Sequence, residues 1–303
     1  MVAEPNSSAE ELAAASASER VRPLPIDDFR ALNRAGEGVS SEQLLHLLEY
    51  SVLAPSTHNS VPQAYRLNAE YARVELCLRR QYVMPASDQR GEQALISVGC
   101  ALENLIVAAR TYALTCSWRP APELSWDRLG HSSKPVVTSV ASVEFAPRQF
   151  VQDERPPNQV LRSMIERRTV RAEFEAGEPL APELRAQLAA CFLEAGARVR
   201  LDIFEAPAEK FAWGKLDEAA TKHKLEEAAF RQELGRSLLS NDDTESVRGM
   251  RGREFGLDDR LTRQLSAELR GDVAMPVDRL AFLARAGLHG LSRASSVCVL
   301  SSL

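Results

Sequence analysis

The residues best suited to chemistry in this chain fall in two short polar segments, the first at residues 54–59 (APSTHN). Pro55 would hold a loop open, while the Ser56 hydroxyl and the Asn59 amide can hydrogen-bond to a polar ligand. The same pattern is also ordinary turn chemistry after a helix, because Pro, Ser and Asn favour turns by themselves. The segment alone therefore allows either a ligand-binding loop or a plain turn.

The second segment, residues 166–171 (ERRTVR), gathers three arginines and a threonine. Guanidinium groups such as those of Arg167, Arg168 and Arg171 make charge-assisted, bidentate hydrogen bonds to phosphate, and the Thr169 hydroxyl adds a neutral donor. A solvated basic turn at a helix end is the alternative, because cations there are favourable with the helix dipole. The segment therefore indicates a phosphate site or a charged helix terminus.

A helix that begins at Ser40 is expected to position the first segment. Ser40 and Gln43, three residues later, form a capping-box pattern, and the leucines that follow give a broad apolar face. Pro55 stops this helix, because proline lacks a backbone donor and disfavours the α conformation in the residue before it. The loop therefore leaves a buried helix, and loops on such rigid elements often carry binding groups.

The remaining pattern predicts an α+β fold. Residues 99–114 (GCALENLIVAARTYAL) are apolar on nearly all faces, which is typical of a buried central helix. Gly287–Gly290 is interpreted as a glycine-bearing turn. Period-two alternation predicts strands at 65–67, 73–78, 136–145, 198–204 and 295–303. Helices are predicted at 160–166, from Pro182 to near Gly196 and at 207–239, a crossing segment at 146–160, and a mobile loop or lid at 240–260.

Taken together and in this order, the two segments resemble the two halves of one flavin mononucleotide (FMN) site in the nitroreductase family. Between them the strand pair, residues 88–90 (DQR) and residues 99–105 (GCALENL) follow the order and approximate spacing of that family. The run Arg167-Arg168-Thr169 resembles its Arg-Arg-Ser phosphate-binding turn. The resemblance is closest to the two-repeat (Acg-like) branch, in which one chain carries both halves of what is elsewhere a dimer-interface site.

The resemblance implies a nitroreductase-like fold, with a central antiparallel-rich sheet flanked by helices and two halves forming a pseudo-dimer. Residues 1–24 are then a disordered arm, 25–150 the first half and 151–303 the second. The implied activity is hydride transfer from NAD(P)H through FMN to a nitroaromatic, quinone or similar acceptor, which needs no acid–base residue from the protein. The implied FMN-binding residues are Pro55, Ser56 and Asn59 on the ring and ribityl side and Arg167, Arg168, Thr169 and Arg171 around the phosphate.

Two departures from the family pattern keep other functions open. The family usually continues Asn-x-Gln-Pro-Trp, whereas Gln63 stands at the Trp position here. Two-repeat relatives also continue past a strand like residues 296–300 with another helix and a final arginine near the phosphate, so the second half is expected to be incomplete. A non-catalytic protein that sequesters FMN beneath a lid, and a degenerate scaffold without flavin, are therefore the alternatives.

The composition indicates a soluble globular protein, with 45% apolar and 26% charged residues. A formal net charge of −5 gives no basic field for nucleic acid. No run reaches the roughly 18 apolar residues of a membrane span. The five cysteines lack Cys-x-x-Cys spacing and no histidine pair has ligand spacing, which predicts no metal and a reducing cytoplasm. We expect a monomeric pseudo-dimer or a homodimer. Asp88 and Arg90 are interpreted as a structural ion pair, and sequence spacing gives His46 no partner.

Overall fold

The computed structural model describes residues 21–34, 36, 38–147, 157–169, 171, 178–194 and 199–302. Its contacts divide the chain into two compact units, the first made of Met1–Thr169 and Ser237–Arg251 and the second of Val170–Arg236 and Gly252–Leu303. The first unit thus extends past residue 150, where the sequence placed the boundary between halves, and it includes a segment from late in the chain. That the halves are repeats stays a prediction.

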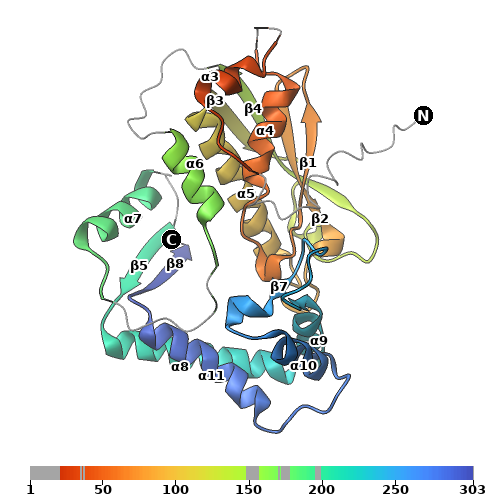
Figure 1. Cartoon of the computed structure of the whole chain (residues 1–303), viewed down its shortest axis with the longest axis vertical. Helices are drawn as coiled ribbons and strands as arrows, with labels where there is room; N and C mark the ends of the chain where they lie inside the picture. The colour runs from red at the N-terminus through yellow and green to blue at the C-terminus, as the bar shows by residue number, and fades with distance from the viewer. Residues whose placement is uncertain are drawn as a thin grey trace. The chain divides into compact units, whose positions relative to one another are not determined.

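A four-stranded antiparallel sheet in the order β1-β2-β4-β3 is the base of the first unit (Figure 1). The predicted hairpin is present, since Tyr65 of β1 pairs with Leu76 of β2. Strand β3 was not predicted, because its first residue, Leu114, was assigned to the central helix and residues 115–120 were assigned to no element. The bounds are β1 (Gln63–Asn68), β2 (Arg73–Arg79), β3 (Leu114–Pro120) and β4 (Val137–Pro147). This antiparallel sheet with its helices confirms a mixed α and β architecture.

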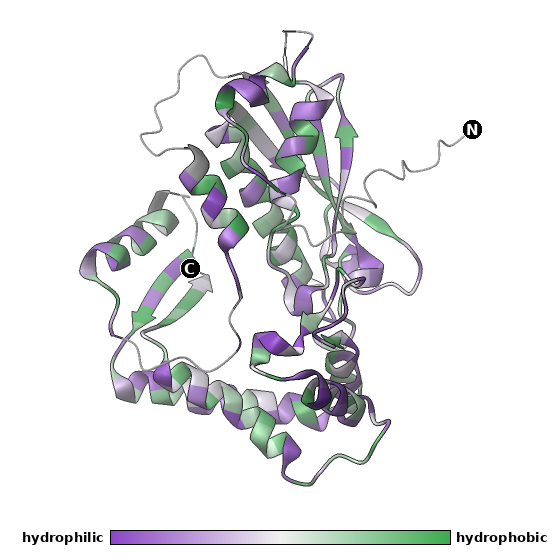
Figure 2. Ribbon diagram, viewed as in Figure 1, coloured by the Kyte–Doolittle hydropathy of each residue, from purple (hydrophilic) through white to green (hydrophobic). Residues whose placement is uncertain are grey.

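Two buried helices form the core with this sheet. Helix α4 (Ser41–Ser51) begins with the predicted capping box, in which the Gln43 N–H donates to Ser40 Oγ (3.2 Å) and the Ser40 N–H donates to Gln43 Oε1 (3.1 Å). Helix α5 (Glu92–Thr111) contributes Leu105 and Ala108, both fully buried, to the same cluster. Figure 2 shows the alternation of hydrophobic and hydrophilic residues along these elements. The first unit therefore has its own hydrophobic core.

Asp88 and Arg90, at the start of α5, do not form the ion pair that the sequence predicted. Asp88 is 5% exposed, and its two carboxylate oxygens accept from the N–H groups of Gln93 (3.1 Å) and Ala94 (2.8 Å). Arg90 instead pairs with Glu92, at 3.3 Å. The predicted Asp88–Arg90 pair is therefore wrong, because a carboxylate at a helix start gains more from free backbone donors there.

Helix α5 is also long and apolar enough to cross a membrane by length and composition, although the sequence reading found no such run. Of its most apolar stretch, 56% is buried inside the protein. It packs against α4 and the sheet, which is the behaviour of a core helix.

A buried polar network lies beside this core. His46 Nδ1 is 2.9 Å from Glu49 Oε2, and its Nε2 is 3.0 Å from the Tyr112 hydroxyl, partners that the spacing of the histidines did not indicate. The same hydroxyl accepts from the Leu24 N–H (3.0 Å) and lies 3.2 Å from the Tyr50 hydroxyl. Residues 1–20 of the predicted arm lie outside the described residues. Leu24, also within the range assigned to that arm, is thus tied to the core.

The second unit is mainly helical. Helices α8 and α11 pack closely, and a Cβ added at Gly287 would lie 1.7 Å from Asp217 Oδ2. Gly287 and Gly290 both lie within α11, so the predicted glycine turn was wrong. Strands β5 and β8 confirm both predicted strands and pair antiparallel. The bounds are α7 (Pro182–Glu194), β5 (Val199–Phe204), α8 (Pro207–Glu226), α9 (Ala228–Ser237), α10 (Asp259–Arg270), α11 (Arg279–Arg293) and β8 (Val297–Ser302).

The predicted helix over 207–239 is interrupted at Glu227, between α8 and α9. Residues 240–260 also hold more regular structure than a loop, namely β7 (Met250–Arg251), the 3₁₀ turn η4 (Gly252–Phe255) and the start of α10. In the first unit, β7 pairs in parallel with β6 (Leu238–Leu239). Helix α3 (Ile26–Ala31) and helix α6 (Pro157–Glu166) complete that unit, and most of the predicted crossing segment lies outside the described residues.

Candidate functional site

The loop that follows α4 is conformationally unusual. Three non-glycine residues within it have positive φ, at 49° for His58, 52° for Asn59 and 47° for Val61. Such backbone is costly, above all for a β-branched residue, and it is concentrated at functional sites. The Ser56 hydroxyl stabilises the turn by accepting from the Val61 N–H at 3.0 Å, and the Thr57 hydroxyl donates to Gln93 Oε1 at 2.9 Å. The predicted loop is therefore held in one defined shape by its own side chains.

A late segment of the chain, residues 240–251, is fastened to this loop and is called the strap. The Asn59 side-chain amide donates to the carbonyls of Gly249 (3.0 Å) and Val247 (3.2 Å), and the Gly249 N–H donates to the Asn59 carbonyl (3.1 Å). The Arg251 guanidinium donates to the carbonyl of Asp243 at 2.9 Å. The strap, which is part of the segment 240–260 predicted as a mobile loop or lid, is thus hydrogen-bonded to the predicted ligand-binding loop.

Arg167 connects the two predicted motifs within the first unit. Its Nη2 donates to the carbonyl of Leu53 (3.0 Å), directly before the loop, and its Nη1 donates to the Thr169 hydroxyl (3.2 Å). Desolvation and the neighbouring charge of Arg168 lower the pKa of Arg167. Among the described residues, neither arginine forms an ion pair with a carboxylate. Two adjacent, uncompensated guanidinium groups make a suitable place for an anion.

The other predicted phosphate residues differ in their surroundings. Arg168 Nη1 donates to the carbonyls of Ile165 (2.8 Å) and Arg167 (3.0 Å), as expected for a cation at the end of a helix. Arg171 belongs to the second unit, where its Nη1 lies 2.5 Å from Glu254 Oε2. Arg168 therefore has a structural role in addition to any ligand role, and the charge of Arg171 is already paired.

The donor set fits a phosphate better than it fits the flavin ring. Each guanidinium has five N–H donors, and the bonds described above use only some of those of Arg167 and Arg168. On the loop, the strap engages the Asn59 NH₂ group and the Asn59 carbonyl, and the Asn59, Ser60 and Val61 N–H groups bond within the loop. Within the described part of the chain this leaves Asn59 Oδ1 and the Ser56 O–H for a ligand. The residues still fit a flavin, with fewer ring contacts than the sequence predicted.

Two residues that shape this loop were missed by the sequence analysis. Gln93 accepts from Thr57, and Gly249, with a φ of 98°, turns the strap against Asn59. A glycine in a polar segment indicates such a turn, but nothing in the spacing indicates its partner 190 residues away.

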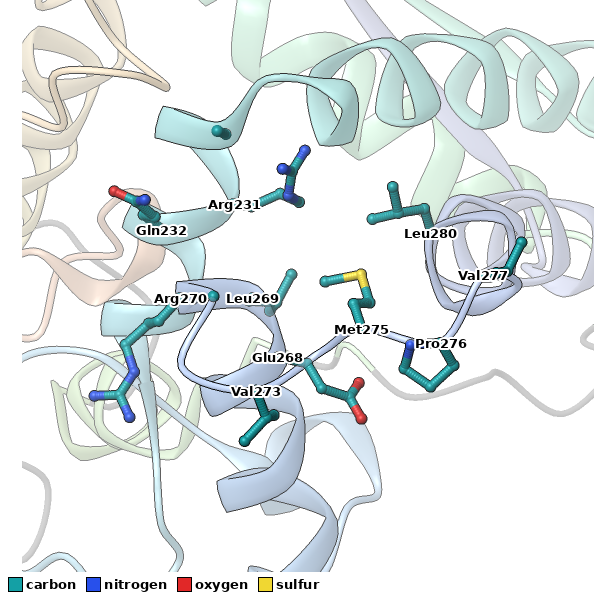
Figure 3. A pocket seen from close by; sticks show the side chains of 12 residues that line it. Arg231, Gln232, Glu268, Leu269, Arg270, Val273, Met275, Pro276, Val277 and Leu280 are labelled. Carbon is teal, nitrogen blue, oxygen red and sulfur yellow. The ribbon is translucent and has the colours of Figure 1, made fainter.

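A cavity of about 310 Å³ lies in the second unit, between α9, α10 and the start of α11 (Figure 3). Leu269, Met275 and Leu280 line it, and the Arg231 guanidinium donates to the carbonyl of Leu225 at 2.6 Å. The buried Glu268 carboxylate pairs with Arg279 at 2.8 Å. None of the predicted binding residues lines this cavity, and it contributes nothing to the predicted flavin site. No group of three or more His, Cys, Asp or Glu residues in the described part of the chain is arranged to hold a metal ion.

Comparison with known proteins gives matches over part of the chain only. No protein-family model matches the chain. Over 125 residues it is 30% identical to "Uncharacterized protein Rv3127" of Mycobacterium tuberculosis (strain ATCC 25618 / H37Rv), a match that covers 41% of this chain and 33% of that protein. Over 171 residues it is 26% identical to "Putative NAD(P)H nitroreductase acg" of the same strain, which covers 50% and 48%. The chain thus spans between a third and a half of these relatives' length, and about half of it is similar to a nitroreductase-like protein.

Proposed function

We propose that this chain binds FMN and acts as an oxidoreductase that passes hydride from NAD(P)H to a small acceptor such as a nitroaromatic or a quinone. The observation that carries the proposal is the hydrogen bond from Arg167 to the Leu53 carbonyl, at 3.0 Å. It joins the two segments that, taken together in the sequence, resemble the two halves of one flavin site. The similarity of half the chain to a putative NAD(P)H nitroreductase supports the same function.

Arg167, Arg168 and Thr169 would hold the phosphate of the cofactor. All three are exposed. Desolvation and, after it, repulsion from Arg168 lower the pKa of Arg167, and an anion between the two guanidinium groups would offset that repulsion. Pro55, Ser56 and Asn59 would line the ring and ribityl side, with Ser56 O–H and Asn59 Oδ1 still available to a ligand. When bound, the flavin supplies the hydride chemistry.

The visible absorption spectrum of the purified protein, before and after addition of NADPH, tests this function. Yellow protein that releases FMN on denaturation and bleaches with NADPH would support the oxidoreductase. Colourless protein that takes up no added FMN would overturn it.

The placement of the phosphate is tested by the double variant Arg167→Ala/Arg168→Ala. We expect it to lose FMN, because two charge-assisted contacts disappear together. Arg162→Ala is the matched control, since Arg162 lies on the same helix α6 and pairs with Glu166 at 3.6 Å. Equal flavin content in the double variant and the control would refute the placement.

Sequestration of FMN without turnover is a second candidate, which the strap favours. The strap is fastened to Asn59 by three hydrogen bonds, an arrangement suited to covering a ligand on this loop. Protein that is yellow but does not bleach with NADPH would select this candidate.

A further inference from the structure

The cavity between α9, α10 and the start of α11 has an aliphatic wall (Figure 3). Leu269 of α10, Met275 of the segment that follows it and Leu280 of α11 point into this space. Val273 and Val277 also line it, and both are exposed, so the cavity opens to solvent beside apolar side chains. Its volume of about 310 Å³ lies at the lower end of the range of small-molecule sites. The cavity therefore has the size and the apolar surface that a small ligand needs.

The helices that bound this space are held in place by a close contact at its edge. A Cβ added at Gly235 of α9 would lie 2.9 Å from the Leu269 Cβ, and Ser266 Oγ donates to the Gly235 carbonyl at 2.7 Å. One turn earlier on α9, Arg231 lines the cavity. Gly271 ends α10 with a φ of 83° and lines it as well. The walls are therefore fixed by the fold, and a ligand would enter a site that is already formed.

One cation on the lining has no counter-charge. Arg231 Nη1 donates to the carbonyls of Leu225 (2.6 Å) and Glu226 (2.9 Å), which fixes the guanidinium at the end of α8. Among the described residues Arg231 forms no ion pair with a carboxylate, whereas Arg270, also on the lining, pairs with Asp272 at 2.7 Å. The Nε and Nη2 of Arg231 remain as donors, and together they form an edge that can bind a carboxylate bidentately.

The acidic residue of the lining, Glu268, does not supply that counter-charge. It is 4% exposed, and its carboxylate accepts from Arg279 Nε and from Gln264 Nε2, both at 2.8 Å. These two partners compensate the buried charge of Glu268. An anion that enters beside Arg231 therefore meets a carboxylate that is already paired, and the positive charge of Arg231 is left for the ligand.

We propose that this cavity binds a small aliphatic monocarboxylate. Arg231 would hold the carboxylate by its Nε and Nη2, and Leu269, Met275 and Leu280 would cover the hydrocarbon chain. An aliphatic chain suits the site better than an aromatic ring, because no aromatic side chain of the described residues lines the cavity for a ring to stack on. The flexible thioether of Met275 can adapt to the shape of such a chain. The site lies in the second unit and does not depend on flavin binding.

Isothermal titration of the full chain with octanoate, octan-1-ol and octylammonium tests the site, because the three probes share one hydrocarbon chain and differ in the charge of the head group. We expect octanoate to bind about tenfold more tightly than octan-1-ol, the effect of one charge-assisted hydrogen bond, and octylammonium to bind least. Arg231→Gln should remove the preference for octanoate. Arg236→Gln is the matched control, because Arg236 is an exposed arginine of the same helix that does not line the cavity.

The methionine methyl groups report where the ligand binds. A chain labelled with ¹³C at these methyl groups carries five labels, and the signal of Met275 is identified by its loss in Met275→Leu. We expect octanoate to shift the Met275 signal and to leave that of Met84, in the first unit, unchanged. This pattern would locate the bound chain in the cavity.

An unshifted Met275 signal, or equal affinity for octanoate and octan-1-ol, would overturn the proposal. So would a full preference for octanoate in Arg231→Gln, with circular dichroism showing that this variant is folded. If Arg231→Gln fails to fold, Leu280→Trp decides, because the larger side chain fills the cavity and leaves the hydrogen bonds of Arg231 in place. This variant should lose octanoate binding, and an unchanged affinity would overturn the site.

Discussion

Asn59 and Gly249 hydrogen-bond to each other in both directions, across 190 residues of sequence. The Asn59 side chain donates to the Gly249 carbonyl at 3.0 Å, and the Gly249 N–H donates to the Asn59 carbonyl at 3.1 Å. Both residues have positive φ, 52° and 98°, which asparagine and glycine tolerate better than other residues. Asn59, predicted as a ligand-binding residue, therefore also fixes the strap to the loop.

Asn59→Ala should destabilise the protein. Two side-chain hydrogen bonds, worth about 1 kcal/mol each, disappear, and alanine at positive φ adds about 1 kcal/mol. The free energy of unfolding, measured by urea titration, should fall by about 2–3 kcal/mol. Asn59→Gly is the control, because it loses the same bonds but accepts the backbone angle, and its loss should be smaller. An unchanged urea midpoint in Asn59→Ala would contradict the role assigned to this contact.

Gln63→Leu should stabilise the free protein. The Gln63 amide is buried without a partner among the described residues, and leucine has a similar volume without polar atoms. Removing an unsatisfied polar group should raise the free energy of unfolding by about 1–3 kcal/mol. The thermal midpoint measures this change, with Gln63→Glu as the opposite control, because a buried carboxylate should lower it. A lower midpoint for Gln63→Leu would mean that the amide has a structural partner.

The sequence predicted the parts of this fold that depend on local signals. The Ser40–Gln43 capping box, the hairpin of β1 and β2, and the strands β5 and β8 follow from caps and period-two alternation. The end of α5 did not, because residues 99–114 are apolar on nearly all faces and hydrophobicity gives no boundary there. The chain leaves the helix at Ala113, whose φ is 59°. An alanine in the sequence does not indicate such a positive φ.

The candidate site could be predicted from local sequence signals even less completely than the fold. The types of Arg167 and Ser56 indicate what they can bind, yet only the fold shows that Arg167 reaches Leu53, 114 residues away. The glycines at 287 and 290 were misread as a turn although both lie within α11. Close packing against α8 requires a small residue at Gly287 and leaves the same sequence signal, whereas a Cβ at Gly290 would meet no atom within 4 Å among the described residues.

The five cysteines should differ in reactivity toward iodoacetamide. Burial raises the pKa of Cys77 to about 12, and it also raises the pKa of Cys100 and Cys116. Because the thiolate is the reactive form, these three should label slowly at pH 8, while the exposed Cys191 and Cys298 label first. Peptide mass spectrometry over time measures the order, with urea-unfolded protein as the control in which all five should react alike. Early labelling of Cys77 would show that β2 opens readily.

The Glu144 carboxyl on β4 should make the free energy of unfolding depend on pH in acid. The Arg119 and Arg73 guanidinium groups, 2.5 and 2.6 Å from Glu144, lower the pKa of that carboxyl. A carboxyl whose pKa is lower in the folded state stabilises the fold above its unfolded pKa of about 4.3, and this contribution is lost as the pH falls through the folded pKa. The free energy of unfolding should therefore decline below about pH 4.3.

Glu144→Gln should flatten this decline, because the variant has no carboxyl to titrate at that position. Arg119→Gln should flatten it in part, since it removes the larger cause of the shift and leaves Arg73 in place. Urea titrations between pH 3 and pH 7 measure the slopes, and the two variants and the wild-type chain should be compared at one ionic strength, because salt screens exposed pairs. A wild-type slope in Glu144→Gln would mean that other carboxyl groups account for the acid sensitivity and that this pair contributes nothing to it.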